Sequence, residues 1–219
     1  MNLNKYSGLK ITSDKKFNSV IWLFVPLTFG NRKIYKCNNI CTDVPKMLQK
    51  NKLKIMKLFF EEPSKNFQIR GVSRLTKIAV TSVKNYLREL QKDELVKKDK
   101  KTLYPSYVAN QQNRLFRIYK QQFIIFKLYS SGLVDYLEDK LHPRCIILFG
   151  SAGKGEYNKD SDIDIFMQTN EKNINLTKFE KILKHKISLF FEENIDKLSN
   201  ELFNNVINGI KLSGYLKLR

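Results

Sequence analysis

The chain has few of the side chains that bind transition metals or form disulfides. It contains two histidines and three cysteines among 219 residues. Cys37 and Cys41 have no histidine or third cysteine nearby to complete a zinc site, and Cys145 stands alone. His142 and His185 also lack partners at ligand spacing. We therefore expect neither a zinc centre nor a disulfide framework, and the reduced thiols predict a cytoplasmic protein.

Long hydrophobic runs are also missing. The most apolar early stretch, SVIWLFVPLTFG from Ser19 to Gly30, is too short to cross a bilayer and contains Pro26. It begins too far along the chain, without a small-residue cleavage site, to resemble a signal peptide. The sequence thus predicts no membrane segment and no membrane partner.

Acidic residues are scarce relative to basic ones. The chain has 21 Asp+Glu against 40 Lys+Arg, a net charge of +19. Residues 47–110 hold 15 basic and 6 acidic residues (+9), whereas residues 141–219 hold 12 and 10 (+2). Such an excess favours polyanionic partners, nucleic acid above all. Its uneven distribution predicts two domains with different partners. The helix and strand patterns described below predict an α+β protein.

The N-terminal region has no sustained hydrophobic period. From Met47 the pattern changes to an amphipathic helix, MLQKNKLKIMKLFFEE. One hypothesis is that translation begins at Met47 and that 1–46 is an upstream extension; the alternative is an irregular N-terminal arm. We divide the chain into this extension, a domain over 47–108, a helical linker over 109–141 and a domain over 142–219.

The first domain shows an ordered series of short elements. We predict a strand over Phe67–Ile69, a helix over Arg70–Lys77, a tight turn and a second helix from Thr81, with Thr81 and Ser82 as N-caps. A β-hairpin follows over Leu95–Val108. This order resembles the winged helix-turn-helix domains of archaea and bacteria over about 60 residues.

The resemblance implies DNA as a partner. A helix fits the major groove and lysines on a wing reach phosphates, so the base-side candidates are Lys84, Asn85 and Arg88. The phosphate candidates are Lys97, Lys98, Lys100 and Lys101. The alternative is a winged helix used for protein contact or dimerisation.

A long helix is predicted within Asn110–Gly132, ending before Ser130, and a short one over Leu133–Leu141. The apolar face of the long helix is broad. We expect it to join the two domains; a homodimer interface is the alternative.

The candidate phosphate- and metal-binding residues lie in the sequence LFGSAGKGEYNKDSDIDIFM, from Leu148 to Met167. Cys145–Phe149 is an apolar, β-branched run typical of a buried strand. Gly150 and Ser151 form a turn at its end, where a glycine backbone and a hydroxyl can approach phosphate oxygens.

Two aspartates begin the next strand. The two-residue period of a strand places Asp162 and Asp164 on one face. Two carboxylates so close repel each other unless a cation lies between them, and Mg²⁺ is often held by one or two carboxylates plus substrate phosphates. The sequence therefore describes a phosphate-binding turn beside a metal-binding pair.

Gly-Ser, a ten-residue gap and Asp-x-Asp resemble the signature of the DNA polymerase beta-like nucleotidyltransferases, especially their minimal branch. The resemblance covers about residues 140–219 and implies a mixed sheet with flanking helices. It also implies transfer of a nucleoside monophosphate from an NTP, with ATP expected, to a hydroxyl. By this resemblance Asp162 and Asp164 hold Mg²⁺ or Mn²⁺, and Gly150 and Ser151 hold the β- and γ-phosphates. Lys154 either neutralises the triphosphate or is a solvated loop lysine.

One feature of the family is missing. A third carboxylate commonly lies on a later strand, after a helix; here the helix is read over Leu176–His185 and the strand over Lys186–Phe191. The central position of that strand is Ser188. Glu192 could substitute from the strand end, or catalysis could be lost while nucleotide binding remains.

Three functions stay open. The first is a nucleotidyltransferase with a DNA-binding domain; minimal members often act beside a partner toxin, which they nucleotidylate or whose operon they repress. The second is a DNA-binding regulator with a degenerate transferase domain that does no chemistry. The third is an enzyme that modifies nucleic-acid ends delivered by the basic half.

Overall fold

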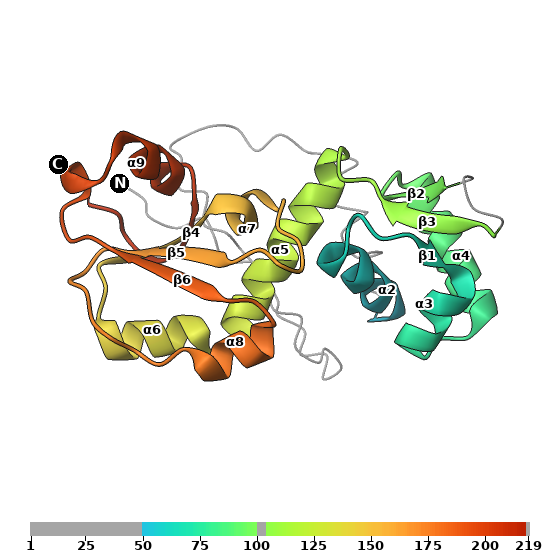
Figure 1. The fold of residues 1–219 in the computed structure, drawn as a ribbon, viewed down its shortest axis with the longest axis horizontal. Helices are drawn as coiled ribbons and strands as arrows, with labels where there is room; N and C mark the ends of the chain where they lie inside the picture. Colours follow the sequence, from blue (N-terminus) through green and yellow to red (C-terminus); the bar gives the residue numbers. More distant parts are fainter. Residues whose placement is uncertain (1–49, 100–103, 218–219) are drawn as a thin grey trace, which may run out of the picture.

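The computed structural model describes residues 50–99 and 104–217, which form two parts, each built on its own sheet (Figure 1). The extension proposed for 1–46, the start at Met47, and Lys100 and Lys101 lie outside these residues. No helix within the described ranges is long and apolar enough to span a bilayer.

The N-terminal part contains three helices and a small antiparallel sheet. Its elements are α2 (Lys50–Glu61), β1 (Phe67–Gln68), α3 (Ile69–Thr76), α4 (Val80–Lys92), β2 (Val96–Asp99) and β3 (Ser106–Ala109). The strands lie in the order β1-β3-β2. The predicted series of strand, two helices and hairpin is therefore present, with the strand before α3 pairing with the second strand of the hairpin.

Apolar side chains at helical spacing on α2 and α4 form the core of this part. Ile55, Met56 and Phe59 of α2 pack with Val83 and Leu87 of α4, all fully buried. These residues recur at three- and four-residue intervals, so each helix turns one apolar face inward. Burial of these side chains, at about 1.5–3 kcal/mol each, is the main source of stability for so small a unit.

The predicted caps of α4 are wrong. The N-cap is Ala79, with no side-chain hydrogen bond, and Thr81 and Ser82 lie inside the first helical turn. The preceding turn explains the earlier start. Lys77 adopts a left-handed conformation (φ 56°) that ends α3, and the Ser73 hydroxyl donates to the Ile78 carbonyl at 2.6 Å. This local turn takes the place of a side-chain cap.

The C-terminal part is a four-stranded mixed sheet covered by helices. Its elements are α5 (Arg114–Ser130), α6 (Leu133–Leu141), β4 (Cys145–Phe149), α7 (Gly150–Lys154), β5 (Ile163–Met167), α8 (Thr177–Leu183), β6 (Ile187–Phe191), the 3-10 turn η1 (Ile195–Lys197), α9 (Asn200–Ile207) and β7 (Ile210–Gly214). The strand order is β6-β5-β4-β7, and only β5 and β6 are parallel. The predicted mixed sheet with flanking helices is confirmed.

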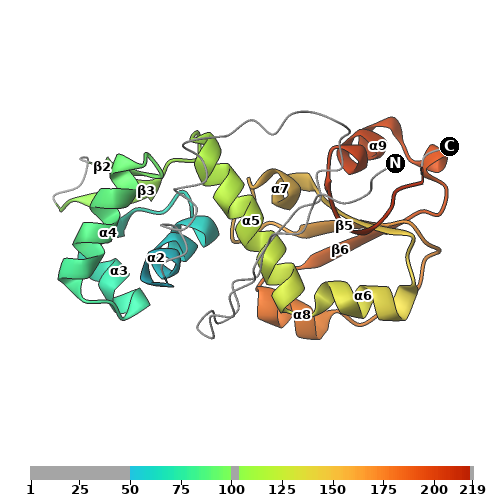
Figure 2. The same cartoon turned by 180° about the vertical axis from the view of Figure 1, so that it is seen from behind.

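The two faces of this sheet pack against different helices. Ile163 and Ile165 of β5 point into a core with α5, α6 and α8, whereas Phe166 joins a smaller cluster with Val206 of α9. Figures 1 and 2 show α6 and α8 on one side of the sheet and α9 on the other. Strand alternation then turns Asp164 away from the larger core.

Helix α5 belongs to both parts. Asn113 caps it by accepting from the backbone N–H groups of Leu115 (2.7 Å) and Phe116 (3.1 Å). Phe116 packs in the N-terminal core, while Ile124 and Leu128 pack in the C-terminal core with the apolar face of α6. The segment 109–141, predicted as a linker, is thus divided between two cores. Phe126 on α5 is exposed, and the alternative of a homodimer interface on this helix stays a hypothesis.

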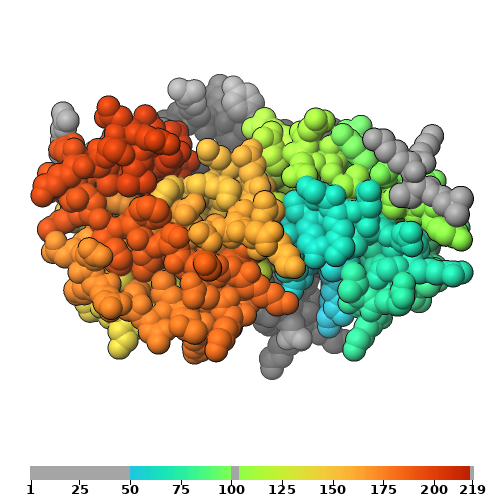
Figure 3. Space-filling model, in the orientation of Figure 1, coloured from blue at the N-terminus to red at the C-terminus, as the bar shows by residue number. Residues whose placement is uncertain are grey.

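The N-terminal and C-terminal parts make further contacts at α5 and at the loop before β5. Glu61 at the end of α2 forms an ion pair with Lys127 of α5 at 3.8 Å. In the space-filling view the start of the N-terminal part abuts the segment that precedes β5 (Figure 3).

Candidate active site

The Gly-Ser turn and the second aspartate meet in the structure. Phe149, the last residue of β4, pairs with Asp164 in the antiparallel register. Gly150 follows with φ +65°, and a Cβ built there would collide with the Asp164 carboxylate, whose Cγ lies 3.2 Å from it. Only glycine fits both the backbone conformation and this contact. The predicted phosphate turn and metal pair are therefore neighbours.

Ser151 and Lys154 are positioned by the short helix α7. The Ser151 carbonyl accepts from the Glu156 N–H at 2.8 Å and the Gly155 N–H, which closes the helix. Within the described residues the Ser151 hydroxyl and the Lys154 amine bond to no protein group. Both side chains are free to contact a ligand.

Helix α5 holds this turn in place. Gln121 donates to the Gly153 carbonyl at 2.6 Å, and Arg117 pairs with Glu156 at 3.3 Å. Gly155, at φ +70°, lies so close to the Arg117 carbonyl that a Cβ would collide with it. Sequence reasoning missed these supporting residues, because each contact spans more than thirty positions.

Lys120 is the most deeply placed of these supports. It is 1 % exposed, donates to the Tyr157 carbonyl and lies 4.5 Å from the centre of the Tyr157 ring. Burial lowers the pKa of Lys120 to about 8, against a smaller opposing effect of Glu156. The polar side chains of α5 thus fix the loop that leads from the Gly-Ser turn towards the aspartates.

The aspartate pair lies at the start of β5. Asp162 is exposed just before the strand, and Asp164 is half-buried within it. Burial raises the pKa of Asp164, and the negative charge of Asp162 raises it further. The same two effects make a cation between the carboxylates favourable.

The donor set fits a hard divalent ion shared with a substrate. No group of three or more His, Cys, Asp or Glu able to hold a metal exists in the part of the chain that the structure describes. Asp162 and Asp164 alone would therefore leave most coordination positions for phosphate oxygens and water, as Mg²⁺ commonly requires.

Ser188 occupies the place beside this pair. In the parallel register of β5 and β6 it lies directly opposite Asp164. Glu192 cannot replace it, because it follows Phe191, which pairs with Met167 at the other end of the strands. Four residues of strand separate the two positions by about 13 Å. Glu192 instead accepts from the Asn194 N–H at 3.0 Å.

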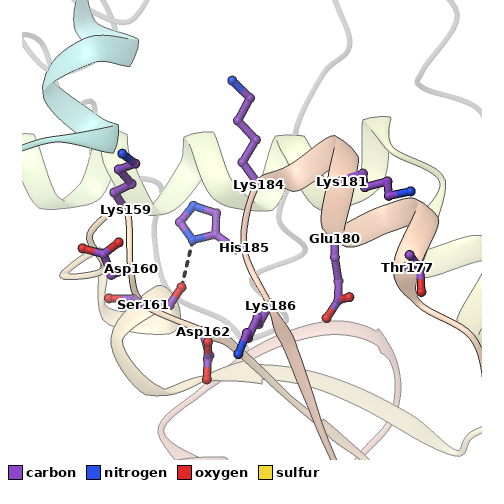
Figure 4. A pocket seen from close by; sticks show the side chains of 10 residues that line it. All are labelled: Lys159, Asp160, Ser161, Asp162, Thr177, Glu180, Lys181, Lys184, His185 and Lys186. Atoms are coloured by element: carbon purple, nitrogen blue, oxygen red, sulfur yellow. Dashed lines mark hydrogen bonds between the residues drawn. The ribbon is translucent and has the colours of Figure 1, made fainter.

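A cavity of about 570 Å³ opens beside Asp162 (Figure 4). Residues of the loop before β5 and of α8 and its C-terminal end line it: Lys159, Asp160, Ser161, Asp162, Thr177, Glu180, Lys181, Lys184, His185 and Lys186. His185 is buried in the wall and donates from Nδ1 to the Ser161 carbonyl at 2.8 Å. Glu180 accepts from the Ile187 N–H at 3.1 Å. Sequence reasoning missed this cavity, although KILKHK showed lysines gathering there.

The predicted DNA-binding residues lie away from this site. Lys84, Asn85 and Arg88 are exposed on α4, and Lys97 and Lys98 are exposed on β2. The Lys97 amine lies 3.4 Å from the Gln112 side-chain oxygen. Both views place α4 and β2 at the opposite end of the molecule from β5 (Figures 1 and 2).

Comparison with known families agrees with the C-terminal part of this description. Residues 132–212 match the model of the family described as "Polymerase beta, Nucleotidyltransferase". The match begins at α6, consistent with the packing of that helix on the sheet. Neither the curated proteins nor the solved structures contain a match to the chain. The family match supports nucleotidyl transfer in general, a chemistry that generally uses an NTP and a divalent metal.

Proposed function

We propose that the C-terminal part transfers a nucleoside monophosphate from an NTP, with ATP expected, to a hydroxyl. The observation that carries this proposal is the contact between Gly150 and the Asp164 carboxylate beside Asp162. That contact joins a turn suited to phosphate and a pair suited to a divalent ion, within the range that matches the family.

The proposed roles follow from position. Asp162 and Asp164 hold Mg²⁺ or Mn²⁺, which when bound neutralises the charge of the reacting phosphates. Gly150 and Ser151 bind the β- and γ-phosphates, and Lys154 neutralises the triphosphate. The acceptor oxygen bonds to the α-phosphorus, the bond to the β-phosphate breaks, pyrophosphate leaves and the hydroxyl proton passes to water.

We further propose that the N-terminal part is a winged helix that binds DNA. The order of helices and strands, with β1 pairing to β3 of the hairpin, supports this assignment. Exposed Lys84, Asn85 and Arg88 would face bases, and Lys97 and Lys98 would face phosphates. A partner protein encoded nearby, such as a toxin, is one source of the acceptor hydroxyl.

A second candidate is a DNA-binding regulator that binds nucleotide without transferring it. Ser188 opposite Asp164 favours this reading, because the position carries no carboxylate to activate an acceptor.

The position of a radiolabel in ATP distinguishes the transferase from the regulator. Incubation with Mg²⁺, a mixture of cell-derived acceptors and ATP labelled on the α-phosphate should label an acceptor, whereas ATP labelled on the γ-phosphate should not. Asp162→Asn with Asp164→Asn should abolish the label. Transfer of the γ-label instead would identify phosphoryl transfer and refute the proposal. Nucleotide binding without any transfer would favour the regulator.

A further inference from the structure

We infer that helix α5 pairs with the α5 of a second copy of this chain, in an antiparallel dimer. The surface that carries the inference is the α5 stripe, which consists of Leu115, Ile118, Gln122, Phe126 and Tyr129. Intervals of three and four residues place these side chains on one side of the helix. The four apolar members are 38–49 % exposed. Figure 2 shows α5 on the near side of the molecule, where no labelled helix or strand crosses it.

Most charged residues of α5 interact with the protein instead of facing water. Lys120 is buried, Arg117 pairs with Glu156 at 3.3 Å, and Lys127 pairs with Glu61 at 3.8 Å. A surface helix normally turns its charged side chains to solvent and its apolar ones to the core. The α5 stripe, by contrast, faces solvent and contains no charged residue. A continuous apolar surface of this kind is typical of a protein contact.

The α5 stripe is symmetric about Gln122. Ile118 and Phe126 lie four residues from it on either side, and Leu115 and Tyr129 lie seven residues from it. If two copies pack antiparallel about a twofold axis at Gln122, Ile118 faces the partner's Phe126 and Leu115 faces the partner's Tyr129. Each contact is then made twice, so the interface is self-complementary and closes with two copies.

Gln122 is the polar residue at the centre of the stripe. A side-chain amide both donates and accepts, so two Gln122 side chains that meet on the axis can hydrogen-bond to each other. A single polar residue in an otherwise apolar helix contact fixes the register of the two helices. A shifted register would place the amide against an apolar side chain, which costs free energy. Gln122 therefore favours the antiparallel register centred on itself.

The charges at the two ends of the α5 stripe are complementary in this arrangement. Arg114 is exposed at the N-terminal end of α5. At the other end, burial raises the pKa of Tyr129, and the negative charges of Glu138 and Asp135 on α6 raise it further. Both carboxylates are exposed and therefore lie near the C-terminal end of the stripe. An antiparallel pair brings Arg114 towards the partner's carboxylates, whereas a parallel pair would bring like charges together.

The dimer would also relate the two N-terminal parts by a twofold axis. Phe116 of α5 packs in the N-terminal core, so that part follows the orientation of the helix. With the DNA binding proposed above, the matching DNA target would be an inverted repeat.

The mass of the full chain in solution tests the inference. Size-exclusion chromatography with light scattering, over about a hundredfold range of concentration, should give a mass near twice 25.8 kDa that falls on dilution. Ile118→Lys and Phe126→Glu each place a charge in the contact. Each variant should weaken dimerisation at least about a hundredfold, because the dimer would bury that charge without a partner.

An equimolar mixture of these two variants tests the antiparallel register. In the mixed dimer the new ammonium group of one chain faces the new carboxylate of the other, and the unchanged Ile118 and Phe126 face each other at the second contact. The mixture should therefore recover the dimer that neither variant forms alone. A parallel pair would set position 118 against position 118, so mixing would restore nothing.

Ile207→Lys is the matched control. Ile207 lies on α9, is 43 % exposed and is not part of the α5 stripe. This variant introduces the same charge at a similarly exposed isoleucine and should dimerise as the wild type does. Thermal unfolding of every variant checks that it is folded.

Three results would overturn the inference. They are a wild-type chain that stays monomeric at the highest concentration, a dimer that survives Ile118→Lys and Phe126→Glu, and a mixture of the two variants that stays monomeric. The first result would assign the stripe to another segment of this chain or to a different protein. None of these measurements depends on nucleotide binding, so they stand apart from the test of the proposed transfer.

Discussion

Replacing Gly150 by alanine should have two effects: a loss of stability, because alanine is strained at this φ, and a loss of NTP binding, because the new methyl group meets the Asp164 carboxylate. At φ +65° a Cβ costs about 1–2 kcal/mol. For a chain of this size that lowers the melting temperature by about 2–8 °C. The new methyl group also meets the Asp164 carboxylate and must displace it. We therefore expect Gly150→Ala to lose Mg-dependent NTP binding at least tenfold, beyond its effect on stability.

The chain provides its own control. Gly132 adopts almost the same conformation, φ +74°, and nothing lies within 4 Å of a Cβ built there. Gly132→Ala should therefore show a similar backbone cost and a similar effect on the unfolded chain. It should leave NTP binding unchanged, because it meets no side chain of the site.

A double-mutant cycle makes the contact itself measurable. In an Asp164→Ala background the collision is absent, so Gly150→Ala should cost only what Gly132→Ala costs. Thermal unfolding gives the stability of each variant, and calorimetric titration gives NTP affinity. If both glycine variants lose NTP binding equally, or if Asp164→Ala does not relieve the cost at Gly150, the packing described for this turn is incorrect.

Three further substitutions test the electrostatics. The raised pKa of Asp164 means that its contribution to stability is lost as pH rises through that pKa. Asp164→Asn should therefore raise metal-free stability at pH 7, by less than about 1 kcal/mol because solvent screens this half-buried carboxylate, and should give no gain near pH 3 in thermal unfolding. Ser188→Asp should lower metal-free stability, tighten Mg²⁺ binding measured by calorimetry and raise the transfer rate about 10²-fold, since it restores a carboxylate opposite Asp164. Lys120 has a folded pKa of about 8, below its unfolded value, so the unfolded chain binds more protons above pH 8. Wild-type stability should rise from pH 8 to 10 in denaturant titrations relative to Lys120→Met, and parallel pH profiles would contradict the burial described.

Local patterns in the sequence were enough to predict the site's central pair. A buried run, a glycine and two aspartates at strand spacing are short-range features, and the antiparallel register of β4 and β5 then brings Gly150 to Asp164. The boundaries of α6 and β4 also matched, because their apolar patterns are strong. The strand pattern predicted the strand that contains Ser188, and the family resemblance supplied the expectation of a third carboxylate there; the register then places Ser188 opposite Asp164.

Features that depend on distant contacts were not predictable in this way. The distance of Glu192 from the aspartate pair depends on the parallel pairing of β5 with β6, and this pairing cannot be predicted from a local sequence pattern. The support of the Gly-Ser loop by Gln121 and Lys120 joins residues more than thirty positions apart. The start of α4 at Val80 has a local cause instead: the turn after α3, in which the Ser73 hydroxyl donates to the Ile78 carbonyl, overrides the capping preference of Thr81.

Calorimetric titration of the full chain with Mg-ATP is the decisive test of a working nucleotide site. We predict binding that requires Mg²⁺ or Mn²⁺ and is lost in Asp162→Asn with Asp164→Asn, while the variant remains folded in thermal unfolding. No binding in the wild type, or binding that is indifferent to both the metal and the two aspartates, would rule out a nucleotidyltransferase site at this turn.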